Sequence, residues 1–97
     1  MSHRERSASL TLFSGSPGEA RTLVSEVAAD WHIEREVAER AELLVSEIVA
    51  DAVDHGSDAA TLRITLEDDK LELELFDGPR RSAIARSGRD EGVPRMT

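Results

Sequence analysis

Residues 47–56 contain the side chains best suited to chemistry in this chain. Glu47, Asp51, Asp54 and His55 are three or four residues apart, and residues at these spacings share one face of an α-helix. Apolar residues at helical spacing border this stripe. Carboxylates near the C-terminal end of a helix repel one another and oppose the helix dipole. We therefore expect the stripe to serve a function and to lie at the edge of a cleft.

The stripe permits three interpretations. Its carboxylates could hold a hard cation such as Mg²⁺, with coordination completed by water or phosphate oxygens. Glu47 could act as a general base toward a hydroxyl or water beside that ion. The third interpretation is a solvated helix face without a ligand, which is the commonest outcome for such spacing. His55 by itself is more often a capping residue than a ligand.

Asp77 is a second candidate. Apolar and polar residues alternate over residues 71–75, which predicts a strand with one buried face, and Asp77 continues the apolar phase. In that phase the carboxylate points toward the helix-covered side of the sheet, where it needs hydrogen-bond donors. Alternatively, the strand ends at Phe76 and Asp77 only starts a turn with Gly78 and Pro79.

Hydrophobic periodicity and turn residues predict the elements that position these side chains. Ser16 is expected to cap a helix, with Pro17 at its first position and Glu19 closing a capping box. Gly56 is expected to end a second helix in the left-handed conformation. The order of elements predicts an α+β fold, a two-layer α/β sandwich with helices packed on one face of a mostly antiparallel sheet. The expected elements are a strand at 10–13, helices at 17–30 and 36–54, and a hairpin of strands at 62–66 and 71–75.

The hairpin should carry opposite charges on its exposed face, where Arg63 is expected to pair with Glu72 or Glu74. Residues 1–8 are polar and are expected to be disordered, and residues 9–79 are expected to form the domain. Residues 80–97 are rich in Arg, Ser and Gly and are expected to form a flexible tail.

Composition excludes several classes of function. A chain of 97 residues has room for one small domain. Its formal net charge of −8 argues against nucleic-acid binding through a basic surface. Without Cys there is no disulfide framework and no thiolate zinc site. Because no apolar run has the length of a signal peptide or a membrane span, we expect a cytoplasmic protein that contacts neither membrane nor nucleic acid directly.

The order of elements and the motifs together resemble a known family. A strand and a capped helix are followed by a helix that ends Leu-Val-Ser-Glu-Ile-Val-Ala-Asp-Ala-Val-Asp-His-Gly and by a hairpin that ends Phe-Asp-Gly-Pro. This resembles the anti-sigma-factor serine kinases of the GHKL (histidine kinase-like) ATPase superfamily, most of all their short actinobacterial members. The resemblance covers about residues 9–80 and implies a Bergerat-type ATPase fold that is truncated at its C-terminus.

In that family the second helix carries the pattern Glu-x-x-x-Asn-Ala-x-x-His-Gly. Its Glu acts on the attacking hydroxyl or water, and its Asn coordinates the Mg²⁺ that bridges the ATP phosphates. By resemblance, Glu47 takes the catalytic role and Asp51 stands at the metal-binding position. Asp77 stands where a family Asp accepts a hydrogen bond from the adenine amino group. The implied nucleotide-binding set is Asp51, Asp54, His55, Asp77 and Gly78.

Two departures from the family weigh against efficient kinase activity. Asp51 replaces the family's Asn and adds a negative charge near the phosphates. The family also continues into a lid, a Gly-x-Gly box whose amides hold the phosphates, and a further strand and helix, whereas here only residues 88–92 resemble that lead-in. Binding of ATP and Mg²⁺ is therefore expected to be weak or absent. The missing strand should leave a sheet edge open and part of the apolar face uncovered, which predicts a homodimer or an obligate complex.

The resemblance implies control of transcription by partner switching, through contacts with a sigma factor or an anti-sigma antagonist protein. The leading expectation is a degenerate regulatory member that makes little or no use of ATP. The alternative is an active Mg-ATP-dependent serine kinase that phosphorylates the antagonist. A third option is a domain with little activity of its own.

Overall fold

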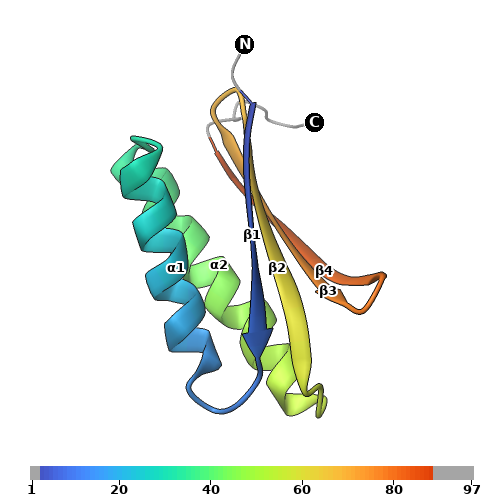
Figure 1. Cartoon of the computed structure of the whole chain (residues 1–97). Coiled ribbons are helices and arrows are strands. Elements are labelled where there is room, and N and C mark those ends of the chain that lie inside the picture. Colours follow the sequence, from blue (N-terminus) through green and yellow to red (C-terminus); the bar gives the residue numbers. More distant parts are fainter. Residues whose placement is uncertain (1–2, 89–97) are drawn as a thin grey trace, which may run out of the picture.

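Two helices pack on one face of a four-stranded antiparallel sheet in the computed structural model, which describes residues 3–88 (Figure 1). The strands lie in the order β1-β2-β3-β4. The predicted α+β class, with helices on one face of an antiparallel sheet, is thereby confirmed. In chain order the elements are β1 (His3–Thr11), α1 (Ser16–Asp30), α2 (Arg35–Asp54), β2 (Ala59–Glu67), β3 (Lys70–Asp77) and β4 (Arg80–Gly88).

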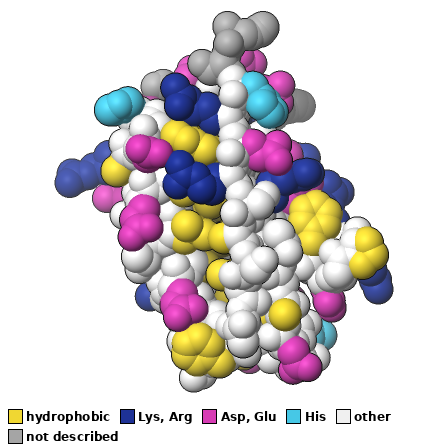
Figure 2. Space-filling view, viewed as in Figure 1, with side chains coloured by type: hydrophobic (Ala, Val, Ile, Leu, Met, Phe, Trp, Pro, Cys, Tyr) yellow, Lys and Arg dark blue, Asp and Glu magenta, His cyan; other side chains and the backbone are white. Residues whose placement is uncertain are grey.

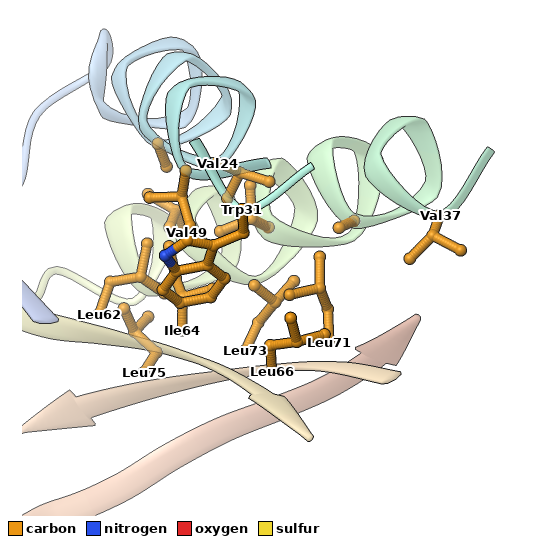
Figure 3. Packing of buried hydrophobic residues seen from close by; sticks show 14 of the residues in the cluster. Val24, Trp31, Val37, Val49, Leu62, Ile64, Leu66, Leu71, Leu73 and Leu75 are labelled. Atoms are coloured by element: carbon orange, nitrogen blue, oxygen red, sulfur yellow. The ribbon is translucent and has the colours of Figure 1, made fainter. Parts of the chain in front are cut away.

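Every second residue of β2 and β3 faces the helices, as the alternation of the sequence predicts. Figure 3 shows these side chains directed at α1 and α2, where Val24 and Val49 meet them. Burial of each such leucine contributes about 2 kcal/mol relative to leaving it exposed. The side chains that are at most 1% exposed on this face of the sheet are Leu62, Ile64, Leu71, Leu73 and Leu75.

The prediction that part of this apolar face would be uncovered is correct only at the margin beside β4, where Ala83 and Ala85 are half-buried. The two helices cover the inward-facing leucines and isoleucine of β2 and β3. Within residues 3–88 the large apolar side chains that remain exposed are Phe13, before α1, and Leu43, on the solvent side of α2. Figure 2 shows further apolar atoms between α1 and β1. Leu10, Leu12 and Leu23 are half-buried and pack against the core.

Helix α1 begins differently from the prediction. Gly15 occupies the N-cap position, and Ser16 is the first helical residue and is buried. The Ser16 hydroxyl accepts a hydrogen bond from the Phe13 amide (2.8 Å) and donates one to the Thr11 carbonyl (3.2 Å). The predicted capping box with Glu19 is therefore wrong, because the serine side chain bonds to the preceding loop and not to the helix amides.

Helix α2 ends as predicted. Gly56 has φ +82°, and the amides of Gly56 and Ser57 donate to the carbonyls of Val53 (3.0 Å) and Ala52 (3.2 Å). This is a Schellman motif, which satisfies the last helical carbonyls and reverses the chain toward β2. Helix α1 ends in the same way, with His32 at φ +56° in the left-handed position.

Both ends of the described chain belong to the sheet, contrary to the prediction. Residues 3–8 are part of β1, so they are not disordered, and the strand predicted at 10–13 in fact ends at Thr11. Residues 80–88 form β4 and are not a flexible tail. The rest of that predicted tail, residues 89–97, lies outside the described residues. The alternation that identifies a strand is weak in both cases, because the inner face carries Arg4 and Arg6 in β1 and small residues such as Ala83 and Ala85 in β4.

No helix within residues 3–88 is both long and apolar enough to cross a membrane.

Candidate functional site

The last turns of α2 present the predicted stripe to solvent. Val45 and Val49 of this helix are fully buried against the core, which turns the neighbouring face outward. The prediction that the stripe adjoins the apolar face is therefore confirmed. The exposed residues of the stripe are Glu47, Asp51, Asp54 and His55.

A pocket of about 260 Å³ lies between the C-terminal end of α2 and the turn that joins β3 to β4. Asp51 and His55 line it from the helix, and Asp77 and Arg80 line it from the strands. The structure thus brings together three of the predicted site residues, which come from segments well separated in the sequence. The remaining lining residues are Ile48, Ala52, Ser57, Ser82 and Ala83.

His55 is held by the end of its own helix. Its Nδ1 lies 2.8 Å from the Asp51 carbonyl oxygen and 3.7 Å from the Asp51 carboxylate. The hydrogen bond to that carbonyl, and then the negative charges of Asp51 and Asp54, raise the pKa of His55 above its ordinary value of 6.5. The negative end of the helix dipole also stabilises a protonated imidazole at this position. These contacts agree with the interpretation of His55 as a capping residue.

Asp77 is the last residue of β3. Its predicted orientation is correct, and its predicted burial is not. It continues the phase of the buried leucines and lines the pocket, but it is exposed, because the strand here extends past the cover that the helices provide. The predicted burial of Asp77 is wrong. The chain then turns sharply: Gly78 has φ +66°, and Asp77 lies opposite Arg80 in the backbone register of β3 and β4. Gly78 is therefore explained by its turn conformation.

The other predicted residues do not join the pocket. Glu47 is exposed one turn earlier on α2 and does not line the pocket. Asp54 is also outside the lining and contributes through its charge on His55. Within residues 3–88 no three His, Asp or Glu side chains converge as a metal site. A Mg²⁺ ion at Asp51 would thus depend on water or ligand oxygens for most of its coordination.

The residues present do not fit the triphosphate of ATP. Phosphates are held by backbone amides and cations, as in glycine-rich loops at helix N-termini. Two carboxylates, Asp51 and Asp77, line this pocket, and Arg80 is the one Lys or Arg among its described lining residues. After the turn, β4 runs back along β3 until Gly88 lies opposite Lys70, at the far end of the sheet. Residues 80–88 therefore form a strand that leads away from the pocket and do not form a lid over it.

A different carboxylate is bound tightly on the face of the sheet away from the helices. Glu74 is 5% exposed, and its Oε1 accepts from Arg63 Nη2 (2.7 Å) and Nε (2.9 Å), while its Oε2 accepts from Arg81 Nη1 (3.0 Å). The guanidinium carbon of Arg63 lies 5.2 Å from the centroid of the Phe76 ring. Burial by itself raises the pKa of Glu74, but the hydrogen bonds from Arg63 and Arg81 outweigh burial and lower it.

This cluster confirms the predicted pairing of Arg63 with Glu74, which face each other directly in the register of β2 and β3. From the sequence, Arg80 and Arg81 are possible counter-charges for a phosphate on a flexible tail. Their fixed positions, with Arg81 bonded to Glu74 and Arg80 lining the pocket, were not predicted. Residues 82–87 read Ser-Ala-Ile-Ala-Arg-Ser and give no clear alternation, because three apolar residues are consecutive and two of them are alanine.

Known proteins add no independent assignment. No protein-family model matches this chain, and no curated protein sequence matches it. The resemblance to GHKL serine kinases therefore depends on the order of elements and on the motifs of α2 and β3.

Proposed function

We propose that this protein is a regulatory binding protein of the anti-sigma factor/serine kinase type, which acts in transcriptional partner switching and makes weak or no use of ATP. In this proposal it works in the cytoplasm and binds a sigma factor or an anti-sigma antagonist protein. Two features support the proposal: the motif at residues 47–56 ends a helix beside the sheet, and Asp77 ends the adjoining strand.

The observation that carries the proposal is the charge of the pocket. Asp51 and Asp77 both line it and are both exposed, and neither forms an ion pair with Lys or Arg within residues 3–88. A triphosphate placed there meets carboxylates of like charge, with Arg80 as the counter-charge among the described lining residues. The architecture therefore favours contacts with a protein over chemistry on a nucleotide.

The alternative function is an active Mg-ATP-dependent serine kinase. One observation favours it: Asp51, His55 and Asp77 line the same pocket although they come from different elements. A carboxylate at position 51 can ligate Mg²⁺ as well as an amide can. Against this alternative, Glu47 does not line that pocket.

Recovery of the partner tests the proposal. The tagged chain is isolated from its own cells, bound proteins are identified by mass spectrometry, and binding is measured again with purified components, with and without Mg-ATP. We expect a sigma factor or an anti-sigma antagonist, bound with the same affinity in the presence and absence of Mg-ATP. If the partner acquires phosphoserine, or if its affinity requires ATP, the alternative holds. If neither class of protein binds the purified chain, the proposal is wrong.

A further inference from the structure

The two margins of the sheet differ in how they are protected. Within residues 3–88, β1 pairs with β2 alone and β4 pairs with β3 alone, so each presents one unpaired edge (Figure 1). An unpaired strand is a template for another strand. Proteins that remain monomeric block such edges with inward-facing charges, bulges or covering segments.

Strand β1 carries inward-facing charges. Arg4 and Arg6 lie opposite the buried residues Leu66 and Ile64, so they are on the helix-covered face of the sheet. The guanidinium of Arg6 donates to the Asp30 carboxylate at 2.8 Å and lies over the Trp31 ring at 5.8 Å. A second strand beside β1 would have to desolvate these arginines, which disfavours pairing at this edge.

Strand β4 has no such protection in its central part. Its inward-facing residues, Ala83, Ala85 and Ser87, are small and uncharged, and they lie opposite the buried leucines of β3. On the outer face Ile84 is half-buried, and Arg86 is neutralised by Glu72 at 2.8 Å. The irregular register beside Ser82 is confined to the turn end, so the pairing with β3 is regular from residue 83 to residue 88.

Apolar side chains next to this edge are incompletely covered. Ile48 and Ala52 of α2 are half-buried, as are Ala83 and Ala85 of β4, and all four pack against the margin of the core. Three of them, Ile48, Ala52 and Ala83, line the open pocket at the end of the strand. A strand added beside β4 would remove part of this apolar surface from water.

We propose that β4 pairs antiparallel with β4 of a second copy of this chain, around a two-fold axis at Ala85. In this register Ala85 faces its own counterpart, Ile84 faces Arg86 of the second copy, and Ala83 faces Ser87 of the second copy. Between residues 82 and 88 of the two copies no two like charges are directly opposite, which favours self-pairing of this stretch. The two sheets become one continuous antiparallel sheet, with all helices on the same face.

A second copy is the partner proposed for this edge because β4 is complementary to itself. The small residues Ala83, Ala85 and Ser87 face one another on the inner side, and Ile84 of each copy faces Arg86 of the other on the outer side. The inference concerns assembly and does not depend on whether the pocket binds a nucleotide.

Single cysteines test the geometry directly, because the chain has no Cys of its own. Ile84→Cys places a thiol on the outer face near the proposed axis, where its counterpart is about 7 Å away and within reach of a short bismaleimide. Ser7→Cys is the matched control, since it lies on the same face of the sheet in the middle of the other edge strand. We expect the reagent to link Ile84→Cys into covalent dimers and to leave Ser7→Cys unlinked.

Sedimentation equilibrium at micromolar concentration provides the second readout. The chain should have twice its mass of 10.6 kDa. Ile84→Lys puts a second positive charge beside Arg86 of the other copy and should reduce the mass to 10.6 kDa, whereas Leu43→Lys, on the exposed side of α2, should not. A wild-type mass of 10.6 kDa, or cross-linking of Ser7→Cys in place of Ile84→Cys, overturns the proposal. If Ile84→Lys does not fold, the comparison of the Ile84→Cys and Ser7→Cys variants decides the question.

Discussion

Two groups of carboxylates in this molecule differ in burial and in hydrogen bonding. Glu74 is buried on the outer face of the sheet and receives hydrogen bonds from two arginines. Asp51 and Asp77 are exposed around the pocket and have no bonded Lys or Arg within residues 3–88. Glu74 thus contributes to the fold, whereas the one described ion pair of the pocket acids is that of Asp51 with the His55 imidazole at 3.7 Å. Acids that no Lys or Arg binds are the ones available for contact with another molecule.

Among these carboxylates, removal of Glu74 should reduce the stability of the fold the most. Glu74→Ala leaves two arginine side chains without their shared acceptor, and we expect it to lower the free energy of unfolding by about 2 kcal/mol. Asp77→Ala and Asp51→Ala should each change it by less than about 0.5 kcal/mol. Urea denaturation followed by circular dichroism measures all three. An equal loss in Glu74→Ala and Asp77→Ala would show that the two groups do not differ.

Acid should act on the fold through Glu74. Because its folded-state pKa lies below the ordinary value of 4.5, the stability that Glu74 contributes is complete above pH 4.5 and is lost as pH falls through the lower, folded-state pKa. Glu74→Gln should therefore be less stable than wild type at neutral pH and should converge with it in strong acid. Urea denaturation over a pH series checks this. A difference that does not depend on pH would contradict the ion-pair account.

The turn at Gly56, and not the neighbouring acids, should hold the end of α2. A side chain at this position meets no atom within 4 Å, so Gly56→Ala is opposed by its φ of +82° alone. We expect a loss of about 1 kcal/mol. Gly18→Ala is the control, since it lies inside α1 with space around it, and it should be neutral or stabilising. Thermal unfolding compares the two, and equal melting temperatures would contradict the strained-turn account.

The smallest expected effect concerns His55. Its raised pKa means that its contribution to stability is complete below the ordinary value of 6.5 and is lost as pH rises through the higher folded-state value. NMR titration of the imidazole protons should give a value above 6.5. Asp51→Asn should lower it only in part, since the carbonyl hydrogen bond remains. A His55 pKa at or below the ordinary value would remove the proposed contact with the helix end.

The buried face of the sheet could be predicted from the sequence because its signal is strong. Leucine and isoleucine alternate with polar residues in β2 and β3, and two apolar helical stripes precede them. Strands β1 and β4 were missed or shortened, since an edge strand needs apolar residues on only part of one face. The inward arginines of β1 and the alanines of β4 give no clear alternation. Edge strands are recognised from their pairing partners, which a local pattern does not contain.

Helix spacing and strand phase were sufficient to predict part of the candidate site. Spacing put Asp51 and His55 on one face of α2, and strand phase put Asp77 on the helix side of the sheet. Two facts depend on tertiary structure: where the helix cover ends, which exposes Asp77, and where the chain goes after Pro79, which takes β4 away from the pocket. The Ser16 capping box failed for a similar reason, because a nearby loop competed for the hydroxyl.

Isothermal titration calorimetry with ATP and ADP, each with and without Mg²⁺, tests the central claim that this pocket does not use the nucleotide efficiently. We expect no saturable heat at millimolar nucleotide, and the same result for Asp77→Ala. Saturable binding that requires Mg²⁺ and disappears in Asp77→Ala would contradict the claim and would support the kinase alternative.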